Sequence, residues 1–190
     1  MIKLTDLLLE AINKPKAIFL AGSPGSGKSY LSKQLIPKGF ISINVDDTYE
    51  ELLKSSGLST KIKDFNPDQL SKAASMMGQA TKSTKEKFED LSKQLKNIII
   101  DGTGAASNPI LNKKQELETL GYECFMIVIY TSPMTSLERN KQRDRSLPAD
   151  VLLRTWLSVY KNIDIYKKEF GNNFAIINNE PEIPLETFSL

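Results

Sequence analysis

The chain has 190 residues, and its 25 basic and 23 acidic side chains give a formal net charge of +2 at neutral pH. This size and an apolar fraction of 40% are typical of one globular domain, and so small a net charge does not by itself indicate a nucleic-acid-binding protein. Histidine is absent, which excludes histidine general bases and histidine metal ligands.

Cysteine use and hydropathy bear on location. The one cysteine, Cys124, lies in an apolar run and allows no internal disulfide, which suits a reducing compartment. No apolar run reaches about 18 residues, and Asp6 and Glu10 interrupt the apolar N-terminal stretch. We therefore expect a cytoplasmic protein with no signal peptide and no membrane partner, and a short amphipathic helix over residues 4–12.

Apolar runs separated by helical segments predict an α/β fold in a single domain over residues 1–190. Three of these runs are near-continuous, which is typical of strands covered on both faces in a parallel sheet. The expected strands are Ala17–Ala21, Phe40–Val45, Asn97–Asp101, Glu123–Tyr130 and Phe174–Asn178.

Three dipeptides predict where helices begin, because each joins a capping residue to a proline that suits the first helical position. They are Asn66-Pro67, Asn108-Pro109 and Ser132-Pro133. Gly121 is expected to end the helix that begins near Pro109. Residues 57–95 form an insertion between the second and third strands, and its second half has apolar residues near helical spacing.

The clearest motif is residues 22–29, which fit the phosphate-binding pattern G-x-x-x-x-G-K-[ST] between a strand and a helix. Its backbone N–H groups and the helix N-terminus would bind phosphate, Lys28 would reach the outer phosphates, and Ser29 would hold Mg²⁺. We therefore expect ATP and Mg²⁺ as cofactors. The predicted nucleotide-binding residues are Gly22, Ser23, Pro24, Gly25, Ser26, Gly27, Lys28, Ser29 and Tyr30.

Two aspartates follow the second strand, where ligands gather in a doubly wound sheet. Asp47 and Glu50 have capping-box spacing, which leaves Asp46 freer to act as the base toward an acceptor hydroxyl, with Asp47 as a substrate contact. In the alternative interpretation, both aspartates only cap and solvate the helix start.

The third strand runs into Asp101-Gly102-Thr103-Gly104. Asp101 would assist at the metal or at the acceptor, and Thr103 would contact the substrate. The glycines would allow close approach of backbone or substrate. The alternative is an apolar strand that ends in aspartate for solubility.

A basic segment, residues 139–147, lies between the fourth strand and the helix that begins near Pro148. Arginines placed at a γ-phosphate stabilise the charge that develops on it, so Arg139, Arg143 and Arg145 predict a lid over ATP. The alternative is a solvated helix face.

With these residues, the chain resembles two groups of phosphate-loop kinases over roughly residues 16–170. The Gly22–Ser29 loop, residues 39–47 and residues 147–152 are similar to phage-type polynucleotide 5′-hydroxyl kinases. Residues 101–104, 120–123 and 145–148 are similar to zeta toxins. The resemblance implies a three-layer P-loop NTPase fold, with a five-stranded, mainly parallel sheet in the order 2-3-1-4-5 and helices on both faces.

The two resemblances imply different roles for the same residues. Polynucleotide kinases would make Asp46 the base, with Arg139 and Arg143 in the lid, whereas zeta toxins would make Asp47 the base, with Arg139 and Arg145. The chain departs from both groups. It has Tyr49 or Glu50 where polynucleotide kinases have a basic residue, and Ala105 where zeta toxins have an arginine.

The sequence therefore predicts a kinase that transfers the γ-phosphoryl group of ATP to a hydroxyl, with an antitoxin-like protein as a possible partner. The acceptor stays open between a nucleic-acid 5′-hydroxyl and a nucleotide sugar or small metabolite. Residues 57–95 and the Thr103–Asn108 loop are expected to form its pocket, and strand five with residues 178–184 to border the adenine. The alternative is a nucleotide-dependent regulatory module that hydrolyses ATP without an acceptor.

Overall fold

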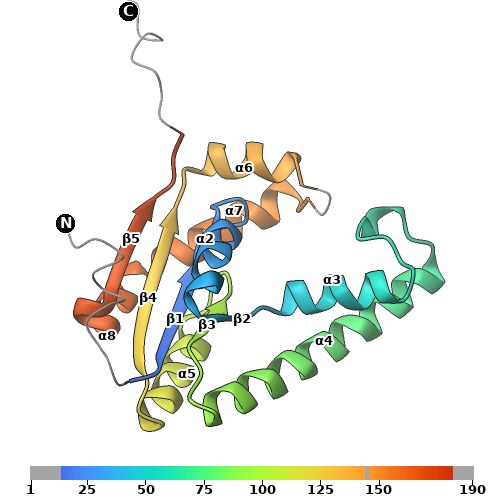
Figure 1. The fold of residues 1–190 in the computed structure, drawn as a ribbon. Coiled ribbons are helices and arrows are strands. Elements are labelled where there is room, and N and C mark those ends of the chain that lie inside the picture. The colour runs from blue at the N-terminus through green and yellow to red at the C-terminus, as the bar shows by residue number, and fades with distance from the viewer. Residues whose placement is uncertain (1–13, 144–145, 182–190) are drawn as a thin grey trace, which may run out of the picture.

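The computed structural model describes residues 14–143 and 146–181. Its centre is a five-stranded parallel sheet in the order β2-β3-β1-β4-β5 (Figure 1). The strands are β1 (Lys16–Ala21), β2 (Ile41–Ile43), β3 (Ile98–Asp101), β4 (Glu123–Tyr130) and β5 (Phe174–Asn178). The predicted fold class and strand order are both confirmed.

Two layers of helices cover the sheet, one on each face. Alternate side chains of β1 therefore pack into the cores on opposite faces. Ile18 and Leu20 pack with Leu31 and Leu35 of α2 (Lys28–Leu35). Phe19 packs on the other face with residues of α5 (Ser107–Thr119) and α8 (Ile163–Phe170). Two further helices, α6 (Pro133–Lys141) and α7 (Ala149–Lys161), follow β4.

A pair of helices, α3 (Val45–Ser55) and α4 (Pro67–Lys93), extends beyond the β2 edge of the sheet (Figure 1). The pair has its own small core, in which Tyr49 and Leu53 of α3 meet Ala73 and Ala80 of α4. A short 3₁₀ turn, Ile62–Asp64, lies between the two helices. This helix pair therefore lies beside the β2 edge of the sheet.

Two predicted helix starts are confirmed. Asn66 caps α4 in a capping box with Gln69, and Ser132 caps α6 by accepting a hydrogen bond from the backbone N–H of Thr135. In both helices a proline follows the cap at the first position, where its missing N–H group has no partner to lose.

The third predicted start is wrong. Helix α5 begins at Ser107, with Ala106 in the cap position and no side-chain cap. Pro109 falls within the first turn, where backbone N–H groups have no intrahelical partner, so the proline is tolerated without marking the boundary. Helix α5 ends at Thr119, and Gly121 follows with a φ of 91°, as expected for a glycine beyond a helix end.

The predicted capping box of Asp47 and Glu50 is also wrong. Strand β2 ends at Ile43, and Asn44 caps α3 by accepting a 2.8 Å hydrogen bond from the backbone N–H of Asp46. Both aspartates therefore lie in the first turn of α3, where carboxylates interact favourably with the helix dipole.

The predicted helix over residues 4–12, the lid residue Arg145 and residues 182–184 lie outside the described residues. Within the described ranges, no helix combines the length and the apolar character needed to cross a bilayer.

Candidate active site

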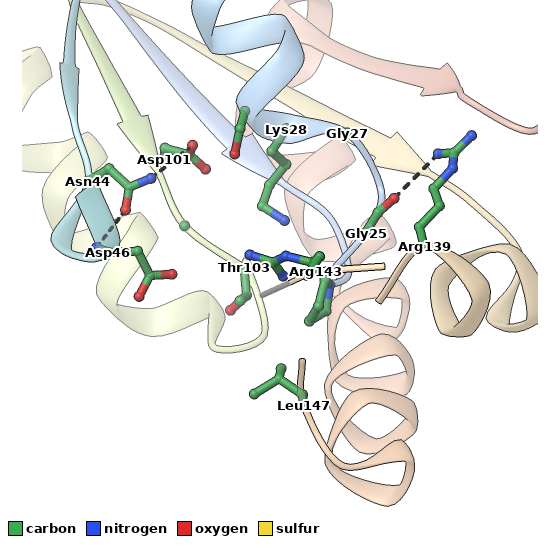
Figure 2. A pocket seen from close by; sticks show the side chains of 13 residues that line it. Gly25, Gly27, Lys28, Asn44, Asp46, Asp101, Thr103, Arg139, Arg143 and Leu147 are labelled. Carbon is green, nitrogen blue, oxygen red and sulfur yellow. Dashed lines mark hydrogen bonds between the residues drawn. The ribbon is translucent and has the colours of Figure 1, made fainter. Parts of the chain in front are cut away.

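A cavity of about 420 Å³ lies at the carboxyl ends of β1, β2 and β3. Segments far apart in the sequence line it, namely the loop after β1 with the start of α2, the start of α3, the loop after β3, and α6 with the residues that follow (Figure 2). The lining residues are Pro24, Gly25, Gly27, Lys28, Ser29, Asn44, Asp46, Asp101, Gly102, Thr103, Arg139, Arg143 and Leu147. The cavity therefore brings together residues from each predicted site segment.

The loop between β1 and α2 has the backbone shape of an anion site. Gly25 and Gly27 have φ angles of 84° and 102°, which favour glycine. A β-carbon at Gly25 would also lie 3.0 Å from the backbone oxygen of Ser136. The loop leads directly into the N-terminus of α2, where free N–H groups and the helix dipole favour negative charge.

Lys28 is held inside this loop. Its Nζ donates hydrogen bonds to the backbone oxygens of Gly22 at 2.7 Å and Ser23 at 3.1 Å. Burial lowers the pKa of Lys28 to about 8, against the opposing effect of the Asp101 carboxylate and with a further lowering from Arg143. Burial has removed the Lys28 ammonium group from water, so a bound phosphate would stabilise its charge.

Not every predicted loop residue lines the cavity. Gly22, Ser23, Ser26 and Tyr30 do not, and Tyr30 is 70% exposed. Ser23 is buried behind the loop, and its Oγ lies 2.8 Å from Ser136 Oγ on α6. Ser23 therefore ties the loop to α6.

The acidic side of the cavity is organised by Asn44. Its Nδ2 donates a 3.2 Å hydrogen bond to Asp101 Oδ2, while its Oδ1 accepts from the backbone N–H of Asp46 (Figure 2). Asn44 thus joins the end of β3 to the start of α3. Sequence reasoning missed this role, although an Asn two residues before an acidic helix start is itself a capping signal.

The three aspartates differ in placement. Asp46 and Asp101 line the cavity, and Asp47 does not. Burial raises the pKa of Asp101, Lys28 opposes this effect, and the neighbouring aspartates add to it. Burial also raises the pKa of Asp47, together with the nearby Glu50 carboxylate. Of the two candidate bases, Asp46 is the one that faces the cavity.

The predicted lid arginines point to different places. Arg139 donates to the backbone oxygens of Gly25 at 3.3 Å and Asn179 at 3.0 Å. Figure 2 shows the Arg139 guanidinium on the far side of Gly25, whereas the Arg143 guanidinium lies on the same side as Lys28 and Thr103.

Asn140 holds the chain after α6. Its side chain donates to the backbone oxygen of Leu147 at 2.8 Å and accepts from the backbone N–H of Leu147 at 3.0 Å. This reciprocal pair brings Leu147 into the cavity wall. Nothing in the sequence around Asn140 indicated this role.

The loop after β3 is fixed against the phosphate-binding loop. Gly22 N–H donates a 2.9 Å hydrogen bond to the Thr103 backbone oxygen, and Tyr166 Oη donates one of 2.7 Å to the Gly104 backbone oxygen. A β-carbon at Gly104 would collide with the side chain of Ala21, so this glycine allows the two loops to approach. Thr103 thereby reaches the cavity.

The segment after β5 contacts the back of the phosphate-binding loop. Asn179 Nδ2 donates a 2.8 Å hydrogen bond to the Ser26 backbone oxygen, and Glu180 accepts a 2.8 Å bond from the Thr135 hydroxyl. Neither Asn179 nor Glu180 lines the cavity. The expected adenine border at residues 178–184 stays a prediction.

The side-chain oxygens in the cavity suit Mg²⁺, because Ser29 offers a hydroxyl and Asp101 a carboxylate. Within the described ranges, no group of three or more Cys, Asp or Glu side chains could hold a metal ion. A magnesium ion here would therefore need further oxygens, such as those of nucleotide phosphates.

Comparison with known proteins shows which family the chain belongs to. The sequence model of the zeta toxin family matches residues 3–176. The chain belongs to the zeta toxin family. Toxin zeta of Streptococcus pyogenes is 23% identical over 171 residues, which cover 89% of this chain and 58% of that protein. This zeta toxin family member thus spans little more than half the length of the curated relative.

Solved structures share the fold of this zeta toxin family chain. The PezAT chromosomal toxin–antitoxin system of Streptococcus pneumoniae matches 90% of this chain and 70% of its own, with a TM-score of 0.62 and 18% identity. A chain of the Pnkp1/Rnl/Hen1 RNA repair complex matches 84% of this chain and 48% of its own, with a TM-score of 0.60 and 21% identity. AvrRxo1-ORF1:-ORF2 with ATP matches 87% of this chain and 55% of its own, with a TM-score of 0.66 and 19% identity.

Proposed function

We propose that this protein is a kinase that transfers the γ-phosphoryl group of ATP to a hydroxyl acceptor. The observation that carries the proposal is one cavity in which Lys28 lies inside a phosphate-binding loop, and in which Asp46, Asp101 and Arg143 lie near enough to influence its charge. Family membership and the similarity to a structure solved with ATP support it.

The donor half of the site binds and positions the triphosphate. The loop amides and Lys28 hold the β- and γ-phosphates, and Ser29 and Asp101 would hold Mg²⁺. When bound, the ion neutralises phosphate charge. Arg143 stabilises charge on the transferring group, while Arg139 supports the loop through Gly25. Arg145 keeps its proposed lid role.

The acceptor half orients a hydroxyl. Asp46 faces the cavity and accepts the hydroxyl proton, and Thr103 on the opposite loop contacts the acceptor. Asn44 holds Asp101 in a fixed position relative to the start of α3 through its two hydrogen bonds. Asp47 acts on the acceptor only through its charge, because it does not line the cavity.

The test is transfer of labelled γ-phosphate from ATP–Mg²⁺ to 5′-hydroxyl DNA and RNA, UDP-amino sugars, nucleosides and water. Lys28→Ala should abolish transfer, and a variant with near wild-type turnover would refute the assignment. Asp46→Asn should bind ATP and fail to transfer, with Asp47→Asn as the matched control. Loss of transfer in Asp47→Asn alone would move the base to Asp47.

The same assay decides the alternative of a regulatory module, which would release label only to water. We also propose an antitoxin-like protein partner, supported by the shared fold with the PezAT system. Such a partner should lower the transfer rate of the wild-type protein when the two are mixed.

A further inference from the structure

Three segments meet on the side of the phosphate-binding loop where the Arg139 guanidinium lies (Figure 2). They are the loop itself, the first turn of α6, and the two residues after β5, Asn179 and Glu180. The contact between loop and Asn179 is close, because a β-carbon at Gly27 would collide with Asn179 Nδ2. The Asn179 side chain therefore packs directly against the loop.

Asn179 connects this loop to the sheet. Its backbone N–H donates a 2.9 Å hydrogen bond to the backbone oxygen of Tyr130, the last residue of β4. Its backbone oxygen accepts a 3.0 Å hydrogen bond from Arg139. From this fixed backbone, Asn179 Nδ2 donates a 2.8 Å hydrogen bond to the Ser26 backbone oxygen. The end of the sheet therefore sets the direction of the Ser26 carbonyl.

The direction of the Ser26 carbonyl also determines that of the next N–H group. No peptide bond among the described residues is cis, and in a trans peptide the C=O and N–H groups point in opposite directions. The Gly27 N–H group therefore points away from Asn179. Gly27 lines the cavity and Asn179 does not. The hydrogen bond from Asn179 thus favours the peptide orientation that offers an N–H group, and not a carbonyl oxygen, to a bound phosphate.

Glu180 joins the same segment to α6. Its carboxylate accepts hydrogen bonds from the Ser132 backbone N–H, from the Ser132 hydroxyl at 3.2 Å and from the Thr135 hydroxyl at 2.8 Å. Ser132 is the N-cap of α6, where the helix dipole favours negative charge. Burial alone would raise the pKa of Glu180, but the hydrogen bonds from Ser132 and Thr135 lower it. The carboxylate is therefore ionised at neutral pH and holds the helix start.

We propose that Asn179 is a positioning residue for triphosphate binding, which acts through the Ser26–Gly27 peptide, and that Glu180 anchors it to α6. This inference rests on the proposed function, in which the loop binds ATP. Asn179 acts without touching the ligand, because it holds the peptide in its binding orientation before ATP arrives. Without the Asn179 side chain, binding must first restore that orientation, and the affinity falls.

The experiment measures the affinity of the full-length protein for ATP–Mg²⁺ and for inorganic tripolyphosphate with Mg²⁺ by isothermal titration calorimetry. Tripolyphosphate has no base, so it reports on the phosphate-binding loop alone. Asn179→Ala should weaken the binding of both ligands by a similar factor of about three- to tenfold, as expected for one lost hydrogen bond. The matched control is Asn172→Ala, which changes an exposed asparagine in the 3₁₀ turn before β5 and should bind both ligands like the wild type.

A second variant tests the anchor. Glu180→Ala removes the hydrogen bonds to α6 and keeps the Asn179 amide, so it should weaken both ligands less than Asn179→Ala does. Because both residues act through one peptide, the double variant should bind about as weakly as Asn179→Ala, whereas independent residues would multiply their factors. Melting curves without ligand show which variants are folded at the assay temperature. If Asn179→Ala is unfolded there, the comparison of Glu180→Ala with wild type decides.

The outcomes separate this inference from the kinase assignment. Weaker ATP binding with unchanged tripolyphosphate binding would overturn the inference, because Asn179 would then contact the adenine base. Wild-type affinity for both ligands in the folded variants would also overturn it and leave a purely structural contact. Either result keeps the kinase assignment. A wild-type protein that binds neither ligand would overturn the proposed function together with this inference.

Discussion

Replacing Asn44 tests how the acidic half of the site is held together. Its side chain makes two hydrogen bonds, one from Nδ2 to Asp101 at 3.2 Å and one to Oδ1 from the backbone N–H of Asp46 at 2.8 Å. Asn44→Ala removes both. Asn44→Ser keeps an oxygen that can cap α3 and removes the amide that reaches Asp101. The pair of variants thus separates the cap from the bridge.

The stability loss follows from the two bonds. A lost helix cap costs about 1 kcal/mol, and a lost hydrogen bond to a half-buried carboxylate costs about 1 kcal/mol more. We expect Asn44→Ala to lower the free energy of unfolding by about 2 kcal/mol, or the melting temperature by roughly 4–8 °C. Asn44→Ser should lose about half as much. Urea or thermal denaturation measures both values.

The two variants should differ less in activity than in stability. If Asn44 acts by positioning Asp101, both variants should lose a similar factor in kcat, on the order of tenfold, because both lose the amide donor. The hydrogen bond from Asn44 lowers the pKa of Asp101, so both variants should also move the acid limb of the pH–rate profile to higher pH. Wild-type kcat and an unshifted acid limb in Asn44→Ser would show that Asn44 is only a cap and refute the reasoning.

Three further changes test separate features. Because the pKa of Lys28 is about 8, ATP binding at pH 8 should take up about half a proton, seen by calorimetry in two buffers, and Lys28→Arg should take up none. The raised pKa of Asp101 means that the folded chain binds more protons than the unfolded chain just above the ordinary carboxyl pKa. Asp101→Asn should therefore raise the melting temperature at pH 7 while lowering transfer, with the gain in stability vanishing below about pH 4. Gly78 lies within α4 with no atom near its missing β-carbon, so Gly78→Ala should add about 0.5–1 kcal/mol of stability in denaturant unfolding with transfer unchanged.

Much of the fold was predictable because its signals are local. Continuous apolar runs predict buried parallel strands, and β4 and β5 have the bounds that the sequence predicted. The strand order could not come from these runs, since hydropathy does not say which strands pair, and it came from family resemblance. The start of α3 was missed because Asn44 and Asp47 both look like caps, and the choice depends on where β2 ends.

The site residues at the strand ends could be predicted from the sequence. The residues that hold these segments in place through hydrogen bonds could not. Lys28 and Asp101 could be named because a loop motif and a strand end are contiguous in sequence. Asn140 and Asn179 act through contacts with backbone atoms of distant or irregular segments, which no periodicity indicates. The separate directions of Arg139 and Arg143 likewise depend on how α6 ends, a feature of the three-dimensional packing.

These supporting contacts explain why selectivity for the acceptor should reside in the acceptor half of the cavity. The donor half is held by fixed hydrogen bonds, since Lys28 is bound to loop oxygens, Arg139 to Gly25, and Ser23 to Ser136 on α6. Under the proposed function, this half would bind the triphosphate of ATP, which is the same for every acceptor. The start of α3, by contrast, belongs to a helix pair that has its own small core. Substitutions on the acceptor side of the cavity should therefore change which acceptor is used, whereas substitutions at Lys28 should abolish transfer to all of them.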